Sequence, residues 1–408
     1  MRICMILDHH FPPDIRIEKE ARSLAAAGHT ITLMCRNRGD QPESETIGGI
    51  RVNRIRYTPP KFLGGYSLSY HLRFVDLVWE KALEKGLEEH PADALHVHDL
   101  PMVKTCLRIG RRRKIRVVFD MHENWPEELI QGRKPREDNS WVRMRDRIRN
   151  FVLFNNRRYV RLEKEVIRKA DRIIVVVDEM KDRLTSLGID PLKITVVMNT
   201  SPGDTAFSID PAGTDFPEWT GRFVVAYAGG FQSLRGLDTL VRAAAIARKR
   251  IPNILLLLMG QGDQEALLNL QCQSLDLAGH AVFTGWIPLE EMMRRLRRSD
   301  VCVIPHRVNP HTDTTIPHKL FQYMALAKPV VATPVAPIRR IVEETDCGIV
   351  VPDGSAEEMA EALVRLTDRR LAARLGENGR KAVEIRYHWE ADSKKLVELY
   401  GSPTFAKN

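Results

Sequence analysis

The sequence contains no apolar run that approaches the roughly 20 residues of a membrane-spanning helix. Its first residues become polar too early for a secretory signal peptide, and they predict a first buried strand instead. The six cysteines are scattered and form no CxxC pair. This distribution predicts reduced, buried thiols in a cytosolic protein.

The length and the charge distribution further limit the class of protein and its candidate partners. With 408 residues, of which 43% are hydrophobic, the chain predicts a soluble α/β protein of two domains. The net charge of +9 is concentrated in residues 108–116 and 133–161. Such basic stretches attract phosphate groups, so nucleic acid, anionic lipid and a pyrophosphate-carrying substrate are the candidate partners.

Short apolar segments alternate with longer helical patterns along the whole chain. Helices are predicted at Ile17–Ala27 and Val160–Lys169, among others. Several apolar segments are continuous, which is typical of strands buried on both faces of a parallel sheet. The predicted strands are 2–7, 30–35, 50–56, 94–97, 116–120, 172–177 and 194–198, then 223–227, 254–259, 281–284, 301–304, 330–332 and 348–351.

A stretch rich in proline, glycine and threonine divides these strands into two series, so the fold class is α/β with two Rossmann-like, doubly wound domains facing across a cleft. A cleft of this kind is the default ligand site. The predicted parts are a first domain at 1–202, a linker at 203–221, a second domain at 222–385, and a closing helix at 386–408 that can cross back to the first domain.

Residues 314–333 predict a loop, a helix opened by Pro317, and a short strand entered through Lys328 and Pro329. The first backbone N–H groups of such a helix lack partners, and together with the helix dipole they form an anion site. Gln322 lies one turn further, where its amide can meet a ribose or sugar hydroxyl. The alternative is an ordinary loop–helix–strand unit.

Taken in order, several segments resemble the retaining glycosyltransferases of the GT-B fold, in the large family four group, over nearly the whole chain. The resemblance implies a nucleotide-sugar donor as substrate, and neither a cofactor nor a metal. It also assigns the first domain to the acceptor and the second to the donor. The segments are FPPDIRIEKEARSLAAAGHTITLMC, VVFDMHENWPE, ADRIIVVVDEM, VVMNT, YAGGFQSLRGLDTLVRAA, LMGQGD, FTGWIP and TIPHKLFQYMALAKPVVAT.

On the donor side, the resemblance implies a glycine loop whose cations hold the diphosphate. The family often has an arginine where this chain has Gly230, so Arg235 alone remains as a catalytic cation. The family also has two glutamates eight positions apart, where this chain has Thr314 and Gln322. We interpret these as a variant donor pocket, with loss of catalysis as the alternative. The implied donor-binding residues are Gly229, Gly230, Arg235, Trp286, Ile287, Thr314, Thr315, Ile316, His318, Lys319 and Gln322.

In that list, the backbone amides of His318 and Lys319 face the diphosphate, and Thr315 and Ile316 face the sugar. Trp286 and Ile287 lie beside the nucleobase, and simple packing is the alternative for Trp286.

On the acceptor side, the resemblance makes His122 a catalytic residue that meets the donor sugar. The preceding His96-Val97-His98-Asp99 could suggest a metal site, but the sequence shows no third ligand cluster, so we predict no metal. We instead place His98 and Asp99 on the acceptor side. Arg16 either meets an acceptor phosphate or caps a helix.

Residues 133–161 predict a helix with an apolar stripe beside arginines, which is typical of a helix on an anionic membrane surface. The alternative is a helix that packs this stripe on its own domain. A helix on the membrane surface predicts a cytoplasmic protein with peripheral contact to the inner face of the cell membrane. Nucleic-acid binding is not expected, because the arginines lack interleaved aromatic residues.

These observations predict a retaining, metal-independent hexosyltransferase that moves a sugar to an acceptor hydroxyl in the synthesis of a surface polysaccharide, a glycolipid or another glycoconjugate. Two alternatives stay open. One is a nucleotide-sugar epimerase or hydrolase of the same fold. The other is a catalytically weak nucleotide-sugar-binding partner subunit.

Overall fold

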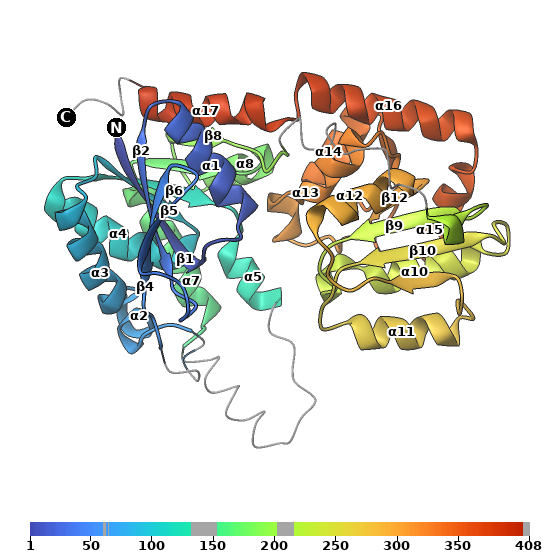
Figure 1. Ribbon diagram of the computed structural model, residues 1–408, viewed down its shortest axis with the longest axis horizontal. Helices are drawn as coiled ribbons and strands as arrows, with labels where there is room; N and C mark the ends of the chain where they lie inside the picture. Colours follow the sequence, from blue (N-terminus) through green and yellow to red (C-terminus); the bar gives the residue numbers. More distant parts are fainter. Residues whose placement is uncertain (60–62, 64, 132–152, 202–215, 403–408) are drawn as a thin grey trace, which may run out of the picture. The chain divides into compact units, whose positions relative to one another are not determined.

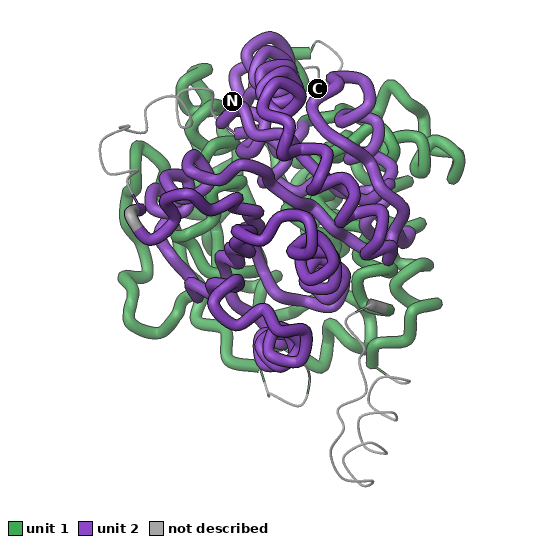
Figure 2. Tube along the Cα trace, turned by 90° about the vertical axis from the view of Figure 1, so that its right-hand side faces the viewer, with its two compact units in different colours: residues 1–197, 393–408 green, residues 198–392 purple. Residues whose placement is uncertain are grey.

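A computed structural model describes residues 1–59, 63, 65–131, 153–201 and 216–402. The chain forms two compact units, coloured separately in Figure 2. Unit 1 comprises Met1–Val197 and Ser393–Asn408, and unit 2 comprises Met198–Asp392. Residues 202–215, most of the predicted linker, lie outside the described part.

Within the described residues, unit 1 contains a sheet of eight strands in the order β3-β4-β2-β1-β5-β6-β7-β8, and its helices are labelled in Figure 1. All neighbouring strands are parallel except β3 and β4. The strands are β1 Arg2–His10, β2 Thr30–Arg36, β3 Ser44–Ile47, β4 Ile50–Ile55, β5 Ala94–His98, β6 Arg116–Met121, β7 Arg172–Val175 and β8 Ile194–Val196. The helices are α1 Ile15–Ala26, α2 Leu68–Arg73, α3 Leu77–Glu89, α4 Leu100–Arg113, α5 Trp125–Gln131, α7 Asn156–Lys169 and α8 Asp178–Ser186.

Unit 2 has, among its described residues, a parallel sheet of six strands in the order β11-β10-β9-β12-β13-β14. Its strands are β9 Phe223–Ala228, β10 Ile254–Met259, β11 Ala281–Phe283, β12 Val301–Ile304, β13 Val330–Ala332 and β14 Gly348–Val350. Its helices are α10 Leu237–Ala247, α11 Glu265–Ser274, α12 Leu289–Arg298, α13 His318–Ala325, α14 Ala336–Thr345, α15 Ala356–Arg365 and α16 Arg369–Ile385.

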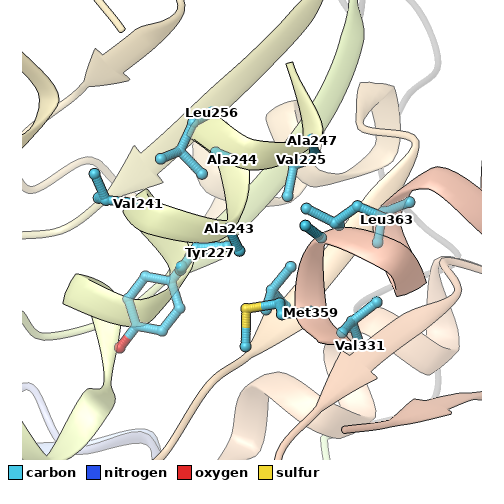
Figure 3. Packing of buried hydrophobic residues seen from close by; sticks show 14 of the residues in the cluster. Val225, Tyr227, Val241, Ala243, Ala244, Ala247, Leu256, Val331, Met359 and Leu363 are labelled. Atoms are coloured by element: carbon cyan, nitrogen blue, oxygen red, sulfur yellow. The ribbon is translucent and has the colours of Figure 1, made fainter. Parts of the chain in front are cut away.

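The core of unit 2 lies between its sheet and two of the helices that cover it. All six side chains of β10 are buried, as expected of a strand covered on both faces. On α10, small residues such as Ala243, Ala244 and Ala247 allow the helix to lie close to the strands, and Met359 and Leu363 of α15 fill the adjoining space (Figure 3). This packing holds the ends of the strands, and therefore their loops, in fixed positions.

Most sequence-based expectations for the fold are confirmed. Every predicted strand is present within a few residues of its expected bounds. The helix expected at Ile17–Ala27 begins earlier, because the carboxylate of Asp14 accepts a hydrogen bond from the Arg16 N–H and caps it. The sequence analysis missed β3, a short edge strand whose side chains are exposed or half-buried.

The last helix, α17 (Trp389–Gly401), belongs to unit 1 from Ser393 onward. Its residues Leu396, Leu399 and Tyr400 are 0%, 6% and 1% exposed, so they complete the core of unit 1. Among the described residues, no helix combines the length and apolar character needed to cross a membrane. The predicted apolar stripe at 141–152 lies outside the described residues.

Candidate functional site

In unit 2, the loops after β9 and β12 come within van der Waals distance of each other. Gly236 has φ +62°, and a Cβ there would lie 1.9 Å from the carbonyl oxygen of Pro305. Gly229 has φ +137°, and a Cβ there would lie 2.6 Å from Nζ of Lys319. Only glycine fits such positions without a backbone shift. The glycines after β9 therefore leave room for side chains that arrive from α13.

The side chain of Lys319 occupies the space beside Gly229. It is 9% exposed, and its Nζ lies 3.8 Å from the centroid of the Tyr227 ring. Among the described residues, no carboxylate pairs with this ammonium. Burial, reinforced by the charge of Arg235, lowers the pKa of Lys319 well below its ordinary value. A buried ammonium without a counter-charge indicates a place for an anion.

A second cation, Arg235, ends the short turn Ser233–Arg235 before α10. Its guanidinium contacts only neutral groups in the described structure: Nε donates to Gln232 Oε1 at 3.3 Å, and Nη1 lies 3.5 Å from Nε2 of His306. His306 is 2% exposed, and burial, then the charges of Arg235 and Lys319, lower its pKa well below the ordinary value. The imidazole is therefore neutral near pH 7 and leaves both positive charges uncompensated.

The start of α13 adds backbone donors. Pro317 is its N-cap, and the N–H of Lys319 has no acceptor among the described residues. The helix is held against β9, because the hydroxyl of Tyr323 accepts a hydrogen bond from the Ala228 N–H at 2.9 Å. The positive end of the helix dipole thus coincides with Lys319. This arrangement agrees with the anion site expected from the sequence.

The two residues that replace the family glutamates differ in environment. The Thr314 hydroxyl is buried and lies 2.9 Å from the Pro310 carbonyl oxygen and 3.1 Å from that of His311, so its proton is used within the loop. Gln322 is half-buried, and its amide has no hydrogen-bond partner among the described residues. Thr315 is half-buried, and Ile316 is buried.

Trp286 follows β11, and its indole is 71% exposed. Trp286 is therefore not part of the buried core, and simple packing on the surface of unit 2 remains the alternative. Gly285, next to it, bridges to Gly260 after β10, since the Gly260 N–H donates to its carbonyl at 2.9 Å. Ile287 is half-buried. A role for Trp286 and Ile287 at a nucleobase stays a prediction.

Unit 1 carries a separate buried cluster at the ends of β5 and β6. Asp120 is 1% exposed; its Oδ2 accepts a hydrogen bond from Nδ1 of His98 at 2.7 Å, and Nε2 of His122 lies 2.9 Å from the same oxygen. The parallel register pairs His98 with Asp120 directly. The oxygen Oδ1 of Asp99 lies 3.5 Å from Nδ1 of His122. The sequence analysis named the three neighbours of Asp120 but missed Asp120 itself.

These contacts shift the pKa values of the side chains in the cluster. Burial lowers the pKa of His122, but the charges of Asp120 and Asp99 overcome this effect and raise it well above its ordinary value. Burial raises the pKa of Asp120, but the charge of His122 and the hydrogen bonds from the histidines hold it well below its usual range. His122 is thus cationic near pH 7. Because His98 is 1% exposed, its imidazole does not face an acceptor substrate directly.

Arg16 lies at the start of α1. Its Nη2 lies 3.0 Å from Oδ2 of Asp14, the residue that caps α1, and its side chain is 28% exposed. The pKa of Asp14 is lowered: burial raises it, but the charge of Arg16 prevails. Asp99 has φ +61° without being glycine, a conformation that costs about 1–3 kcal/mol and is typical of functional sites. Because Asp14 is the cap of α1, the alternative that Arg16 caps a helix is wrong, and a contact of Arg16 with an acceptor phosphate stays a prediction.

The argument against a metal near His96 and His98 needs correction. The sequence shows no third ligand cluster, but the structure brings Glu20 of α1 and Asp120 of β6 to the same place. All four side chains are buried. The sequence gives little indication that Glu20 lies beside His96, because Glu20 belongs to a helix 76 positions earlier in the chain.

Two family profiles match the chain in tandem. The profile described as Glycosyl transferase 4-like domain matches residues 14–200, and the one described as Glycosyl transferases group 1 matches residues 215–382. The chain belongs to the group 1 glycosyltransferases.

Curated relatives of this glycosyltransferase are distant in sequence. D-inositol 3-phosphate glycosyltransferase of Mycobacteroides abscessus is 28% identical over 253 residues, which are 59% of this chain and 53% of that protein. Phosphatidyl-myo-inositol mannosyltransferase of Mycolicibacterium smegmatis is 27% identical over 219 residues, 53% of each chain. The chain thus spans about half the length of these relatives.

Solved structures agree in fold. Sucrose-phosphate synthase from Thermosynechococcus elongatus superimposes with a TM-score of 0.74 at 20% identity, covering 98% of both chains. HepE from Anabaena in complex with UDP and glucose gives a TM-score of 0.73 at 15% identity, covering 98% of this chain and 99% of that one. The two Rossmann-like units of this group 1 glycosyltransferase therefore have the GT-B architecture.

The structure also identifies one feature of the glycosyltransferase that sequence reasoning missed. The sequence left Arg235 as the single cation of the anion site and gave Lys319 only a backbone contact. The side chain of Lys319 instead reaches the space beside Gly229. A lysine at the second position of a helix normally extends into water, so only the shape of the glycine loop reveals its orientation.

Proposed function

We propose that the chain transfers a sugar from a nucleotide diphosphate sugar to an acceptor hydroxyl with retention of the anomeric configuration. The observation that carries the proposal is the convergence of Lys319, Arg235 and the start of α13 on one uncompensated positive site in unit 2. HepE, a neighbour in fold, is described in complex with UDP and with UDP-glucose. A diphosphate fits the charge of such a site.

The proposed chemistry follows from that charge. As the bond between sugar and diphosphate breaks, negative charge accumulates on the leaving phosphate. Preorganised cations and N–H groups stabilise this charge more than they stabilise the bound donor, which lowers the barrier. The leaving phosphate then takes the acceptor proton on the same face of the sugar. In this proposal the two cations neutralise the diphosphate, so transfer does not depend on a divalent metal.

The experiment that tests this function combines donor binding with turnover. A thermal-shift screen across UDP-, GDP- and ADP-sugars is expected to raise the melting temperature with one donor class, since a ligand bound only by the native state stabilises it. The labelled donor is then incubated with and without acceptors, starting with inositol phosphate and phosphatidylinositol because relatives carry these names. The label is expected to move only when an acceptor is present.

Two results would contradict transfer. Release of free sugar or an isomer at the same rate without acceptor would identify a hydrolase or an epimerase. Donor binding without turnover on any of the acceptors would identify a nucleotide-sugar-binding partner subunit.

We also propose a cytoplasmic location with peripheral contact to anionic membrane. The predicted segment 133–161 is described only from residue 153, but the adjoining surface supports the proposal. Leu72 of α2 is 67% exposed, and it lines a surface hollow together with Arg158 and Arg161 of α7 and with Lys104 of α4, which pairs with Glu165 of α7 at 2.9 Å. Exposed leucine beside arginines is typical of a membrane-binding face.

Charge reversal of α7 tests this contact. Each basic residue near an anionic surface contributes about 1 kcal/mol, so Arg161→Glu with Arg168→Glu is expected to weaken pelleting with anionic liposomes more than tenfold. High salt should weaken the wild type likewise. The control, Lys249→Glu with Lys381→Glu, makes the same change in net charge in unit 2. Equal losses in both double variants would contradict a contact through α7.

A further inference from the structure

The buried cluster of unit 1 contains four side chains with metal-binding atoms. Glu20, His96, His98 and Asp120 are 3%, 0%, 1% and 1% exposed. They come from α1, β5 and β6, and one nitrogen or oxygen atom from each lies within 4.8 Å of the others. Two imidazoles and two carboxylates are a ligand set that divalent transition cations accept.

Two of the distances in this cluster are close to those of a tetrahedral site. Nε2 of His96 lies 3.5 Å from Oε2 of Glu20 and 3.4 Å from Oδ2 of Asp120. Around a zinc ion with bonds of about 2.0–2.1 Å, neighbouring ligands lie about 3.3–3.4 Å apart. His98 offers Nδ1, 2.7 Å from Asp120, or Nε2, which has no hydrogen-bond partner. Small side-chain adjustments therefore bring four ligands around one ion.

Several of these atoms lack a partner in the protein. Oε2 of Glu20 and Nε2 of His96 are fully buried and make no hydrogen bond in the part of the chain that the structure describes. Neither Glu20 nor Asp120 forms an ion pair with lysine or arginine there; the one cationic side chain beside them is His122, whose Nε2 lies 2.9 Å from Asp120 and 3.8 Å from Glu20. A single imidazolium does not balance two carboxylates. Buried carboxylates require a compensating charge. A divalent cation between them supplies that charge and satisfies the unpartnered atoms together.

Outer contacts orient the ligands. The hydroxyl of Tyr400 lies 2.8 Å from Nδ1 of His96 and fixes the ring with Nε2 directed at the carboxylates. Such a partner on the second imidazole nitrogen is typical of metal-bound histidine. Nε2 of His122 lies 2.9 Å from Asp120 and fixes this carboxylate in turn.

We propose that Glu20, His96, His98 and Asp120 bind one divalent transition cation of the zinc class. Because four protein ligands fill a tetrahedral shell and all are buried, the site is structural and leaves no position for substrate. The cation joins α1 to the ends of β5 and β6, which carry Asp99 and His122. This inference does not depend on the proposed transfer reaction.

Metal content is the direct test, with zinc as the probe. The full chain is stripped with a chelator, incubated with excess zinc, and passed through a desalting column before elemental analysis. We expect one zinc per chain, a higher melting temperature with zinc than without, and visible absorption of four-coordinate cobalt when cobalt replaces it. His96→Gln and Glu20→Gln should each lose the retained zinc.

Two further variants sharpen the result. Tyr400→Phe removes only the outer contact to His96 and should weaken zinc binding about 10–100-fold. His71→Gln is the matched control: His71 is also 1% exposed, but its Nε2 contacts the Leu63 carbonyl, so zinc should be retained. A wild type that retains no zinc and gives no cobalt spectrum would overturn the proposal, even if a variant fails to fold. Equal zinc in the wild type and in His96→Gln would overturn it as well.

Discussion

Replacing Lys319 with methionine is expected to lower turnover on the nucleotide-sugar by about 10²- to 10³-fold, the usual effect of removing one group that stabilises a developing oxyanion. Methionine has a similar length and fills the space over the Tyr227 ring without a charge. Removing a buried, unpaired ammonium should leave the melting temperature unchanged or raise it. If Lys319→Met loses activity but is as stable as the wild type or more stable, Lys319 serves the reaction and not the stability of the fold.

The control for this prediction is Lys328→Met. Lys328 is half-buried in the same unit, and burial lowers its pKa too, but it lies in the turn before β13. Turnover should stay near that of the wild type. If Lys319→Met retains most of its activity, the ammonium does not contact the diphosphate.

Proton uptake gives an independent readout of the same residue. In the free protein, burial and the charge of Arg235 lower the pKa of Lys319, and a bound diphosphate would raise it again. At a pH between the pKa of Lys319 in the free protein and its pKa in the UDP complex, Lys319 takes up a proton when UDP binds. The affinity for UDP therefore falls as the pH rises through the pKa of Lys319 in the free protein. Calorimetry above pH 7 in buffers of different ionisation enthalpy measures this uptake. The other groups facing Lys319 are Arg235, His306 and Tyr227. Uptake that persists in Lys319→Met would assign the proton to His306 instead.

Arg235→Ala is expected to lower turnover by about 10³-fold, because the guanidinium can hold two phosphate oxygens and remains charged throughout the reaction. The fold should be unaffected, since among the described residues the side chain makes only two long contacts, to Gln232 and His306. Arg235→Lys should recover part of the activity, because it restores the charge without the planar fork.

The matched control is Arg242→Ala on the exposed side of α10. It should have turnover close to the wild type. A double variant of Arg235 and Lys319 should lose less than the product of the single losses, since both cations act on one leaving group. Turnover of Arg235→Ala within a few-fold of the wild type would remove Arg235 from the reaction.

The strands could be predicted because their apolar runs depend on local sequence alone. Val330–Ala332, for example, is a short apolar run bounded by Lys328 and Pro329, and it forms β13 as expected. The strand Ser44–Ile47 could not be found in this way, because an edge strand with polar side chains lacks such a run.

The candidate site was predictable in its backbone but not in its side chains. The loop after β9 and the start of α13 lie where the motifs indicate. The direction of the Lys319 side chain depends on the empty space at Gly229, and the neighbours of His96 depend on a helix and a strand far apart in sequence. Such contacts follow from tertiary packing, which no short window of sequence contains.

The contact between Tyr400 and His96 has a consequence for biosynthesis. Unit 2 is continuous in the chain, so it can fold while translation is still in progress. Unit 1 is synthesised first but needs Leu396, Leu399 and Tyr400 to close its core. Unit 1 is therefore synthesised first but completed last. Its histidine-rich interior stays incomplete until residue 400 has left the ribosome.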